Sequence, residues 1–92
     1  MRTVEFLDAV KKRHALQSDY AVAKLLGWRI SRVYEYRGGH RELDDEGCVQ
    51  VAVALDLPPP YVMACIAAAR AKDATIKKYW QTAAKLLKSG TA

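Results

Sequence analysis

Between Arg29 and Arg41 the sequence gathers side chains that suit contact with a polyanion. This stretch holds four arginines and His40 against a single acid, Glu35. Guanidinium groups form charge-assisted and often bidentate hydrogen bonds with phosphate oxygens, while short polar side chains and carboxylates bond to the edges of bases. The whole chain carries a formal charge of +5 with a pI near 9.4, which also favours polyanionic partners. The pattern therefore predicts contact with nucleic acid.

The two cysteines and two histidines are of residue types that can bind metal ions, but core packing explains them more simply. Cys48 and Cys65 lie in apolar surroundings, as buried thiols of a reducing compartment do. A zinc site is the alternative, and it would need His14 and His40 as well. None of the four shows the close paired spacing of zinc ligands, so core packing is predicted and neither a metal nor a cofactor is expected.

Catalytic and membrane functions find no support in the sequence. No Gly-rich phosphate loop, His-Glu metal pair, or Ser or Cys with a base at a recognisable spacing occurs, so we expect the protein not to be an enzyme. No signal-peptide pattern occurs, and no apolar run approaches the roughly 20 residues that cross a bilayer. We expect a cytoplasmic protein.

Hydrophobic spacing predicts an all-α fold of five to six short helices. Thr3 is the expected N-cap of a first helix to His14, whose inner side carries Phe6, Leu7 and Val10. A second helix is predicted from Ser18 to Leu26, before Gly27. A third follows from Arg29 to Arg37, and Gly38-Gly39 end it.

The second half of the chain also reads as helical. Asp44, Asp45 and Glu46 are expected at the start of a fourth helix, with Val49, Val53 and Leu57 facing inward. After Pro58-Pro59-Pro60, a fifth helix is predicted over 61–72 and a sixth over 74–88. The expected inner stripe of the sixth lies opposite Lys77, Lys78, Lys85 and Lys88, and consists of Ile76, Tyr79, Trp80, Ala83 and Leu87.

Within residues 18–39 the key positions have steric roles. Ala23 is small enough for two helices to cross, Gly27 permits a tight turn, and Val33 fills the angle between the helices. Trp28 and Tyr36 extend this contact. The same bend occurs in some domains that bind protein instead of nucleic acid, so these residues alone specify a fold and not a ligand.

These residues resemble the lambda-repressor-like, or phage repressor/Cro-type, helix-turn-helix family. Its pattern Leu-Ala-x-x-Leu-Gly-Val-x-x-x-x-Ile recurs as Val22-Ala23-x-x-Leu26-Gly27-Trp28-x-x-x-x-Val33. Ser18-Asp19-Tyr20 and the segment Ala69-Arg70-Ala71-Lys72-Asp73 look like small phage and prophage regulators of this type. The resemblance implies one domain over 1–92, a DNA-binding core over 3–57, and a recognition helix over about 29–37, with 58–92 as C-terminal helices.

The resemblance also implies roles for single residues. The second, third and seventh residues of the recognition helix, Ile30, Ser31 and Glu35, match positions that meet base edges. Helical geometry about a buried Val33 agrees on Ser31 and Glu35 but makes Ile30 a packing residue. The expected contacts with the DNA backbone or its flanks are Ser18, Arg29, Arg32, Tyr34, Arg37, His40 and Arg41. Many relatives carry glutamine where this chain has Asp19, for which helix capping is expected instead.

The C-terminal helices raise the question of partners. Every residue from Tyr61 to Ala71 except Arg70 is apolar, so the fifth helix needs cover on more than one side. We expect the last helix to cover one side and a second protomer to cover part of the rest, in a homodimer on a two-fold operator. Membrane binding by the last helix is disfavoured, because its apolar stripe reads as core. The alternative function is a protein-binding regulator, an antitoxin-like or anti-repressor module with the same fold.

Overall fold

The computed structural model describes residues 1–89, and over this range the chain forms six helices and no strand, as the hydrophobic spacing predicts. In chain order they are α1 (Thr3–Arg13), α2 (Asp19–Leu26), α3 (Ile30–Arg37), α4 (Asp45–Leu55), α5 (Pro59–Arg70) and α6 (Ala74–Ser89). The expected C-terminal stretch 58–92 extends past this range, and its last residues, 90–92, lie outside the described part.

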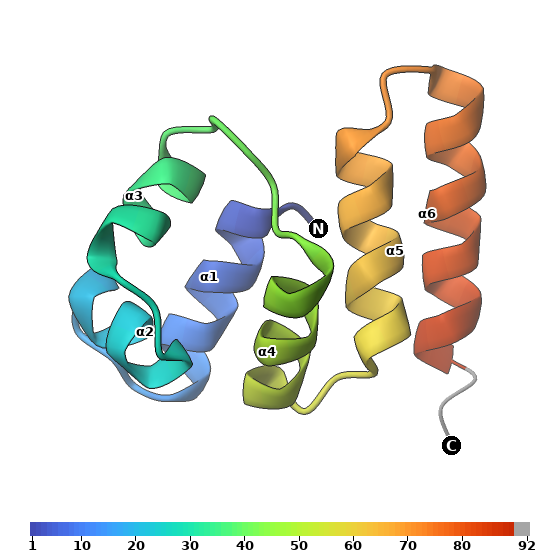
Figure 1. The fold of residues 1–92 in the computed structure, drawn as a ribbon. Coiled ribbons are helices and arrows are strands. Elements are labelled where there is room, and N and C mark those ends of the chain that lie inside the picture. Colours follow the sequence, from blue (N-terminus) through green and yellow to red (C-terminus); the bar gives the residue numbers. More distant parts are fainter. Residues whose placement is uncertain (90–92) are drawn as a thin grey trace.

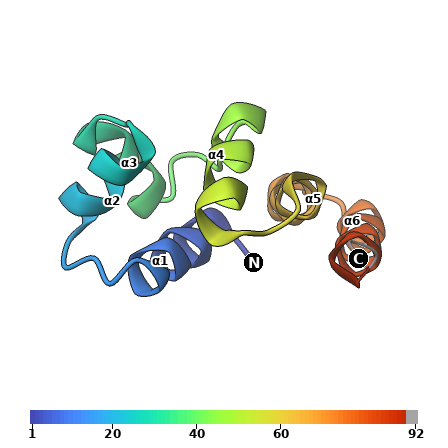
Figure 2. The same cartoon turned by 90° about the horizontal axis from the view of Figure 1, so that it is seen from below.

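The helices make a flat body in which the C-terminal pair extends from one end. Helices α1 to α4 pack together, α5 lies against α4, and α6 packs mainly against α5 (Figures 1 and 2). The body measures 36 × 32 × 19 Å. α2 and α3 stand at the end opposite α6 (Figure 1), so the helix-turn-helix region and the last helix are separate surfaces.

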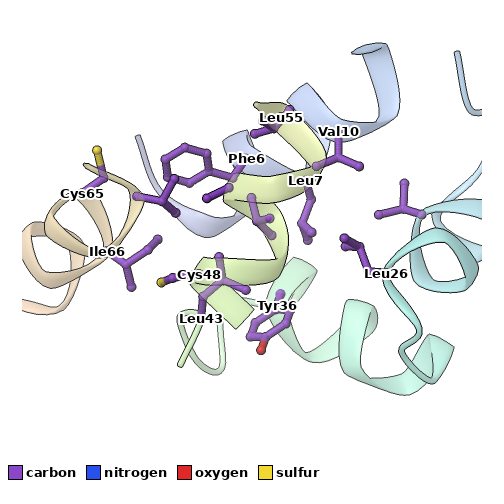
Figure 3. Packing of buried hydrophobic residues seen from close by; sticks show 14 of the residues in the cluster. Phe6, Leu7, Val10, Leu26, Tyr36, Leu43, Cys48, Leu55, Cys65 and Ile66 are labelled. Atoms are coloured by element: carbon purple, nitrogen blue, oxygen red, sulfur yellow. The ribbon is translucent and has the colours of Figure 1, made fainter. Parts of the chain in front are cut away.

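The core lies where α1 packs against α2, α3 and α4, and it continues between α4 and α5. Phe6, Leu7 and Val10 of α1 are fully buried, as predicted, and Figure 3 shows them between α4 and the helices at either side. Ile66 of α5 joins the same cluster. Burial of each large apolar side chain contributes about 1.5–3 kcal/mol. α1 therefore supports α2, α3 and α4, and α4 in turn joins this part to the C-terminal pair.

The start of α1 differs from the expectation for Thr3. The N-cap is Arg2, and Thr3 is the first helical residue, with only 1% of its surface exposed. Its hydroxyl donates to Glu42 Oε1 at 2.8 Å and accepts from the backbone N–H of Leu43 at 3.0 Å. Thr3 therefore holds the loop between α3 and α4 against α1. Glu5 caps the helix, because its carboxylate accepts from the Arg2 N–H at 2.9 Å.

The inner face of α4 is also not the predicted one. Asp44 caps the helix through a 2.7 Å bond from Gly47 N–H, and the acids stand in the first turn as expected. Val49 and Val53 are 42% and 73% exposed, however, while Leu57 is half-buried against the core. The buried positions are Gly47, Cys48, Val51, Ala52 and Leu55. Almost every residue from Gly47 to Leu55 is apolar, so periodicity alone could not select the face.

α5 begins two residues earlier than predicted. Pro59 and Pro60 both stand in its first turn, where a missing N–H leaves no helical bond unmade. The helix is covered by α4 on one side and α6 on the other. Ala68, at 5% exposure, is buried, so α4 and α6 together cover much of the apolar surface of α5.

The predicted inner stripe of α6 is largely open to solvent. Ile76, Tyr79 and Trp80 are 51%, 69% and 43% exposed. Ala83 and Leu87 are half-buried, and among residues 74–88 of this helix only Ala84, at 6% exposure, is buried. The expectation that the stripe is core material is wrong because α6 lies at the edge of the body, with α5 as its main neighbour.

Candidate nucleic-acid interface

A tight turn at Gly27 joins α2 to α3. Gly27 has a left-handed φ of 74°, which glycine adopts without steric cost. The Trp28 N–H bonds to the Ala23 carbonyl at 2.8 Å and the Gly27 N–H to the Lys24 carbonyl at 3.2 Å, the pattern that satisfies the last carbonyls of a helix. At the other end of α2, the Ser18 hydroxyl accepts from the Ala21 N–H at 3.1 Å. Both predicted boundaries of α2 are confirmed.

The contact between α2 and α3 is built as the motif predicts. The Trp28 and Tyr36 rings pack with centroids 5.6 Å apart, and the Trp28 indole N–H donates to Gln50 Oε1 at 2.7 Å. Apart from the exposed turn glycine, all of the predicted core positions are buried, namely Val22, Ala23, Leu26, Trp28, Val33 and Tyr36. The helix pair is therefore a rigid support for whatever α3 presents outward.

The outer face of α3 carries three side chains. Ser31 and Glu35 point to solvent as predicted, and Tyr34, expected as a flanking residue, is 61% exposed between them. Ile30 is half-buried and packs against the core, as helical geometry expects. Only its remaining exposed part is available for the base contact that the resemblance implies.

Arg32 does not extend outward as a phosphate contact would. Its guanidinium carbon lies 4.2 Å from the Trp28 ring centroid, and Nε donates to the Tyr36 hydroxyl at 3.1 Å. A second nitrogen stands 3.4 Å from Asp44 Oδ1 at the start of α4. Only 24% of the Arg32 side chain is exposed, and its contacts join α3 to the start of α4. A contact of Arg32 with the DNA backbone, as predicted, would require these contacts to break.

Arg37 is likewise engaged within the fold. Its two terminal nitrogens contact Asp8 Oδ1 at 2.7 Å and Asp19 Oδ1 at 2.9 Å, and 23% of the side chain is exposed. Burial works against the charge, but hydrogen bonds and attraction from Asp19 and Asp8 outweigh it and raise the pKa of Arg37. Arg37 therefore joins α1, α2 and α3, and its predicted contact with the DNA backbone would require these ion pairs to break. Asp19 serves as its partner and not as the helix cap, which is Ser18.

Arg29, His40 and Arg41 remain exposed around α3. Arg41 Nε lies 3.1 Å from Glu35 Oε2, with both side chains about half exposed, and its guanidinium stands 5.0 Å above the Tyr36 ring. None of the ion pairs within residues 1–89 involves Arg29, the N-cap of α3. An exposed pair such as Glu35 with Arg41 is worth under about 1 kcal/mol, so a phosphate could readily replace the carboxylate.

The end of α3 fixes His40 beside this face. Gly39 has a φ of 75°, and the His40 N–H bonds to the Glu35 carbonyl at 3.2 Å. A Cβ at Gly38 would lie 2.8 Å from the His40 ring. The two glycines thus let the chain turn sharply and bring His40 and Arg41 back along the helix, as the predicted stop at Gly38-Gly39 requires.

Two features of the site escaped the sequence reasoning. Tyr20, in the first turn of α2, is 63% exposed, and its lack of an inward role could have been read from the helical spacing of Val22, Ala23 and Leu26. The second is that most arginines near α3 have intramolecular acid partners. Asp8 is distant in sequence from Arg37, so no local pattern reveals their contact.

The four residues of the alternative zinc site do not come together. Nε2 of His14 lies 2.8 Å from the Ala54 carbonyl oxygen, to which it donates, and both thiols are buried without a disulfide. Among residues 1–89 no group of three or more His, Cys, Asp or Glu side chains is placed to hold a metal ion.

Comparison with known proteins leaves the chain without a relative to guide its assignment. No protein-family model, curated protein or solved structure matches it. Within residues 1–89 no helix combines the length and apolar character needed to span a membrane.

Proposed function

We propose that this protein binds duplex DNA through α2 and α3 and acts as a sequence-specific transcriptional regulator of the phage repressor/Cro type. The observation that carries the proposal is the two-sided build of α3. Its inner side is fixed by Val33 and Tyr36, while Ser31, Tyr34 and Glu35 face solvent in adjacent turns. A rigid helix with short polar side chains outward has the form that enters a major groove.

The cations at the edge of this face suit the DNA backbone. Arg29 precedes the first turn of α3 and is exposed without an ion pair in the described part of the chain. Arg41 and His40 follow the last turn. Phosphate contacts at both ends of a recognition helix fix its register but carry no sequence information. Specificity is then assigned to Ser31 and Glu35, with Tyr34 between them.

The N-terminal end of α2 can add a further backbone contact. Ser18 is exposed at this end, where its hydroxyl accepts from the Ala21 N–H, and the positive end of a helix dipole favours a phosphate. Asp19 would oppose a phosphate at this end, but its carboxylate is held by Arg37 at 2.9 Å. The ion pair reduces the repulsion that an isolated acid would exert.

A protein-binding regulator on the same fold remains the second candidate, and one observation favours it. Arg32, Arg37 and Arg41 all contact acids within the chain, so the positive charge available to DNA is smaller than the sequence suggests. Retardation of random-sequence duplex DNA at increasing salt tests the choice. The DNA proposal expects binding that weakens steeply with salt, and absence of binding at low salt would contradict it.

A further inference from the structure

The exposed apolar side of α6 is the least explained surface of the molecule. We name as the α6 stripe the side chains Ile76, Tyr79 and Trp80, with Ala83 and Leu87 continuing it along the helix. Their spacing of three, four, seven and eleven residues puts them on one side, over a length of about 16 Å. The first three are 51%, 69% and 43% exposed.

The lysines of α6 lie away from this stripe. Lys77, Lys85 and Lys88 line a groove of about 580 Å³ on the other flank of the helix, between α6, α5 and the N-terminus. No residue of the stripe lines that groove. The helix from Ala74 to Ser89 contains no acid. The positive charges of α6 are thus separated from its apolar stripe. A partner that binds the stripe therefore needs no acidic groups to neutralise the lysines.

We propose that the α6 stripe is where a second copy of this chain docks, with the two stripes facing each other across a two-fold axis. A self-paired stripe buries apolar surface on both copies and keeps the lysine flanks apart, so like charges do not meet at its centre. Ala83, small and central in the stripe, leaves room for an aromatic side chain of the other copy. The proposal rests on the proposed function, because a two-fold operator requires two copies of the protein.

The size of the stripe sets the strength of this dimer. From the areas of such side chains, the exposed parts of Ile76, Tyr79 and Trp80 amount to roughly 300 Å² per copy, comparable with the larger apolar patches on monomers. Two copies would bury about 600 Å² from these side chains, and their neighbours add more. That area is below the roughly 1,000 Å² of a stable specific interface. The dimer is therefore weak without DNA, and we expect a dissociation constant on the order of 10–100 µM. DNA would then hold the two copies together.

A second apolar surface provides the matched control. Val53 on α4 is 73% exposed and lines a shallow groove of about 360 Å³ with Leu25 of α2. Tyr79→Glu and Val53→Glu each place a carboxylate at a highly exposed apolar position on a helix. Both variants should keep the helical circular dichroism of the wild type. They differ only in which of the two surfaces they disrupt.

The test is sedimentation equilibrium of the full chain without DNA, from about 1 to 500 µM, a range chosen around the expected dissociation constant. The wild type and Val53→Glu should associate reversibly to twice the monomer mass, with a blue shift of Trp80 emission, while Tyr79→Glu stays monomeric. A wild type that is monomeric throughout, an association unaffected by Tyr79→Glu, or one abolished by Val53→Glu instead would each overturn the proposal. So would a Trp80 shift seen only with phosphatidylglycerol vesicles, because the stripe would then bind lipid. None of these results depends on DNA binding, which is measured separately.

Discussion

The guanidinium of Arg37 at the end of α3 lies 2.9 Å from the carboxylate of Asp19 at the start of α2. This contact joins the two ends of the helix-turn-helix unit. A second nitrogen of the same guanidinium lies 2.7 Å from Asp8 Oδ1 on α1. Arg37, for which the sequence predicts a contact with DNA, therefore also supports α3. Asp19 stands where many proteins of the family that the sequence resembles carry glutamine. Its ion pair with Arg37 explains the acid at this position.

Removal of Arg37 should destabilise the fold. Arg37→Ala removes the closest cation from both carboxylates, and hydrogen bonds to charged groups are worth about 1.5–3 kcal/mol. We expect a loss of about 2 kcal/mol and a fall in melting temperature of roughly 8–16 °C for a domain of this size.

Thermal unfolding of two partner variants provides the control. Asp19→Asn should cost more than Asp8→Asn, because the Asp19 side chain is 27% exposed and that of Asp8 is 61% exposed. Equal melting temperatures for Arg37→Ala and the wild type would show that the contact does not support α3.

Low pH should weaken the contacts of Glu42, in the α3–α4 loop, with Arg2 and Thr3 at the start of α1. Burial of Glu42 opposes its charge, but hydrogen bonds from the Thr3 hydroxyl and N–H and from Arg2 outweigh this and lower its pKa from the ordinary 4.5. A depressed folded pKa gives stability that is complete above about pH 4.5 and is lost as the pH falls through the folded value.

Glu42→Gln should therefore be less stable than the wild type at pH 7 and lose less on acidification. Urea unfolding at several pH values measures this difference. Glu46→Gln, at an exposed position of the first turn of α4, should keep the wild-type response. If Glu42→Gln and the wild type lose stability equally in acid, the ion pair and its hydrogen bonds contribute nothing to folding.

The Cys48 thiol should resist alkylation in the folded protein. Burial is the main cause that raises its pKa to about 11, despite the opposing effect of Arg70, and 1% of the residue is exposed. The thiolate, which is the reactive form, is therefore scarce at pH 8. Reaction with a thiol reagent, followed by mass spectrometry, should modify Cys48 quickly only in denaturant. Rapid labelling under native conditions would mean that α4 opens frequently.

The order of the helices and the α2–α3 turn were predictable because short-range signals determine them. Ser18 and Asp44 cap helices that begin within a few residues of them, and Gly27 ends one at a left-handed φ. The inner face of α4 was not predictable from its periodicity. Cys48 and Val49 are both apolar, and only packing against α1 and α5 decides that Cys48 is buried.

The roles of the arginines and the exposure of α6 depend on long-range contacts. Arg32 looks outward when α3 is turned about Val33, but it folds back over Trp28 and reaches Asp44. Tyr79 has the spacing of a core residue, yet α6 lies at an edge where α5 alone cannot cover it. Amphipathic spacing predicts an apolar face but does not say whether the same chain covers it.

Salt dependence should separate the arginines that meet DNA from those that support the fold. Each phosphate neutralised contributes about −0.9 to the slope of log K against log salt. Arg29→Ala and Arg41→Ala should each flatten the slope by about that amount without changing the melting temperature, whereas Arg32→Ala should lower the melting temperature. Lys78→Ala, on α6 at the far end of the body (Figure 1), is the matched control and should leave the slope unchanged. Fluorescence anisotropy on labelled duplex DNA makes this measurement, and unchanged slopes for both Arg29→Ala and Arg41→Ala would remove them from the interface.

Selection of bound fragments from random duplex DNA, by the wild type and by Glu35→Gln, tests most directly whether the outer face of α3 reads bases. Glu35 could accept from a cytosine N4 amine, a contact worth about 1–3 kcal/mol of discrimination. The wild type should enrich a common two-fold sequence, and Glu35→Gln should relax or change one symmetric pair of positions while binding non-specific DNA equally or more tightly. Failure of the wild type to enrich any sequence, or an identical sequence selected by Glu35→Gln, would contradict recognition of DNA bases by this face.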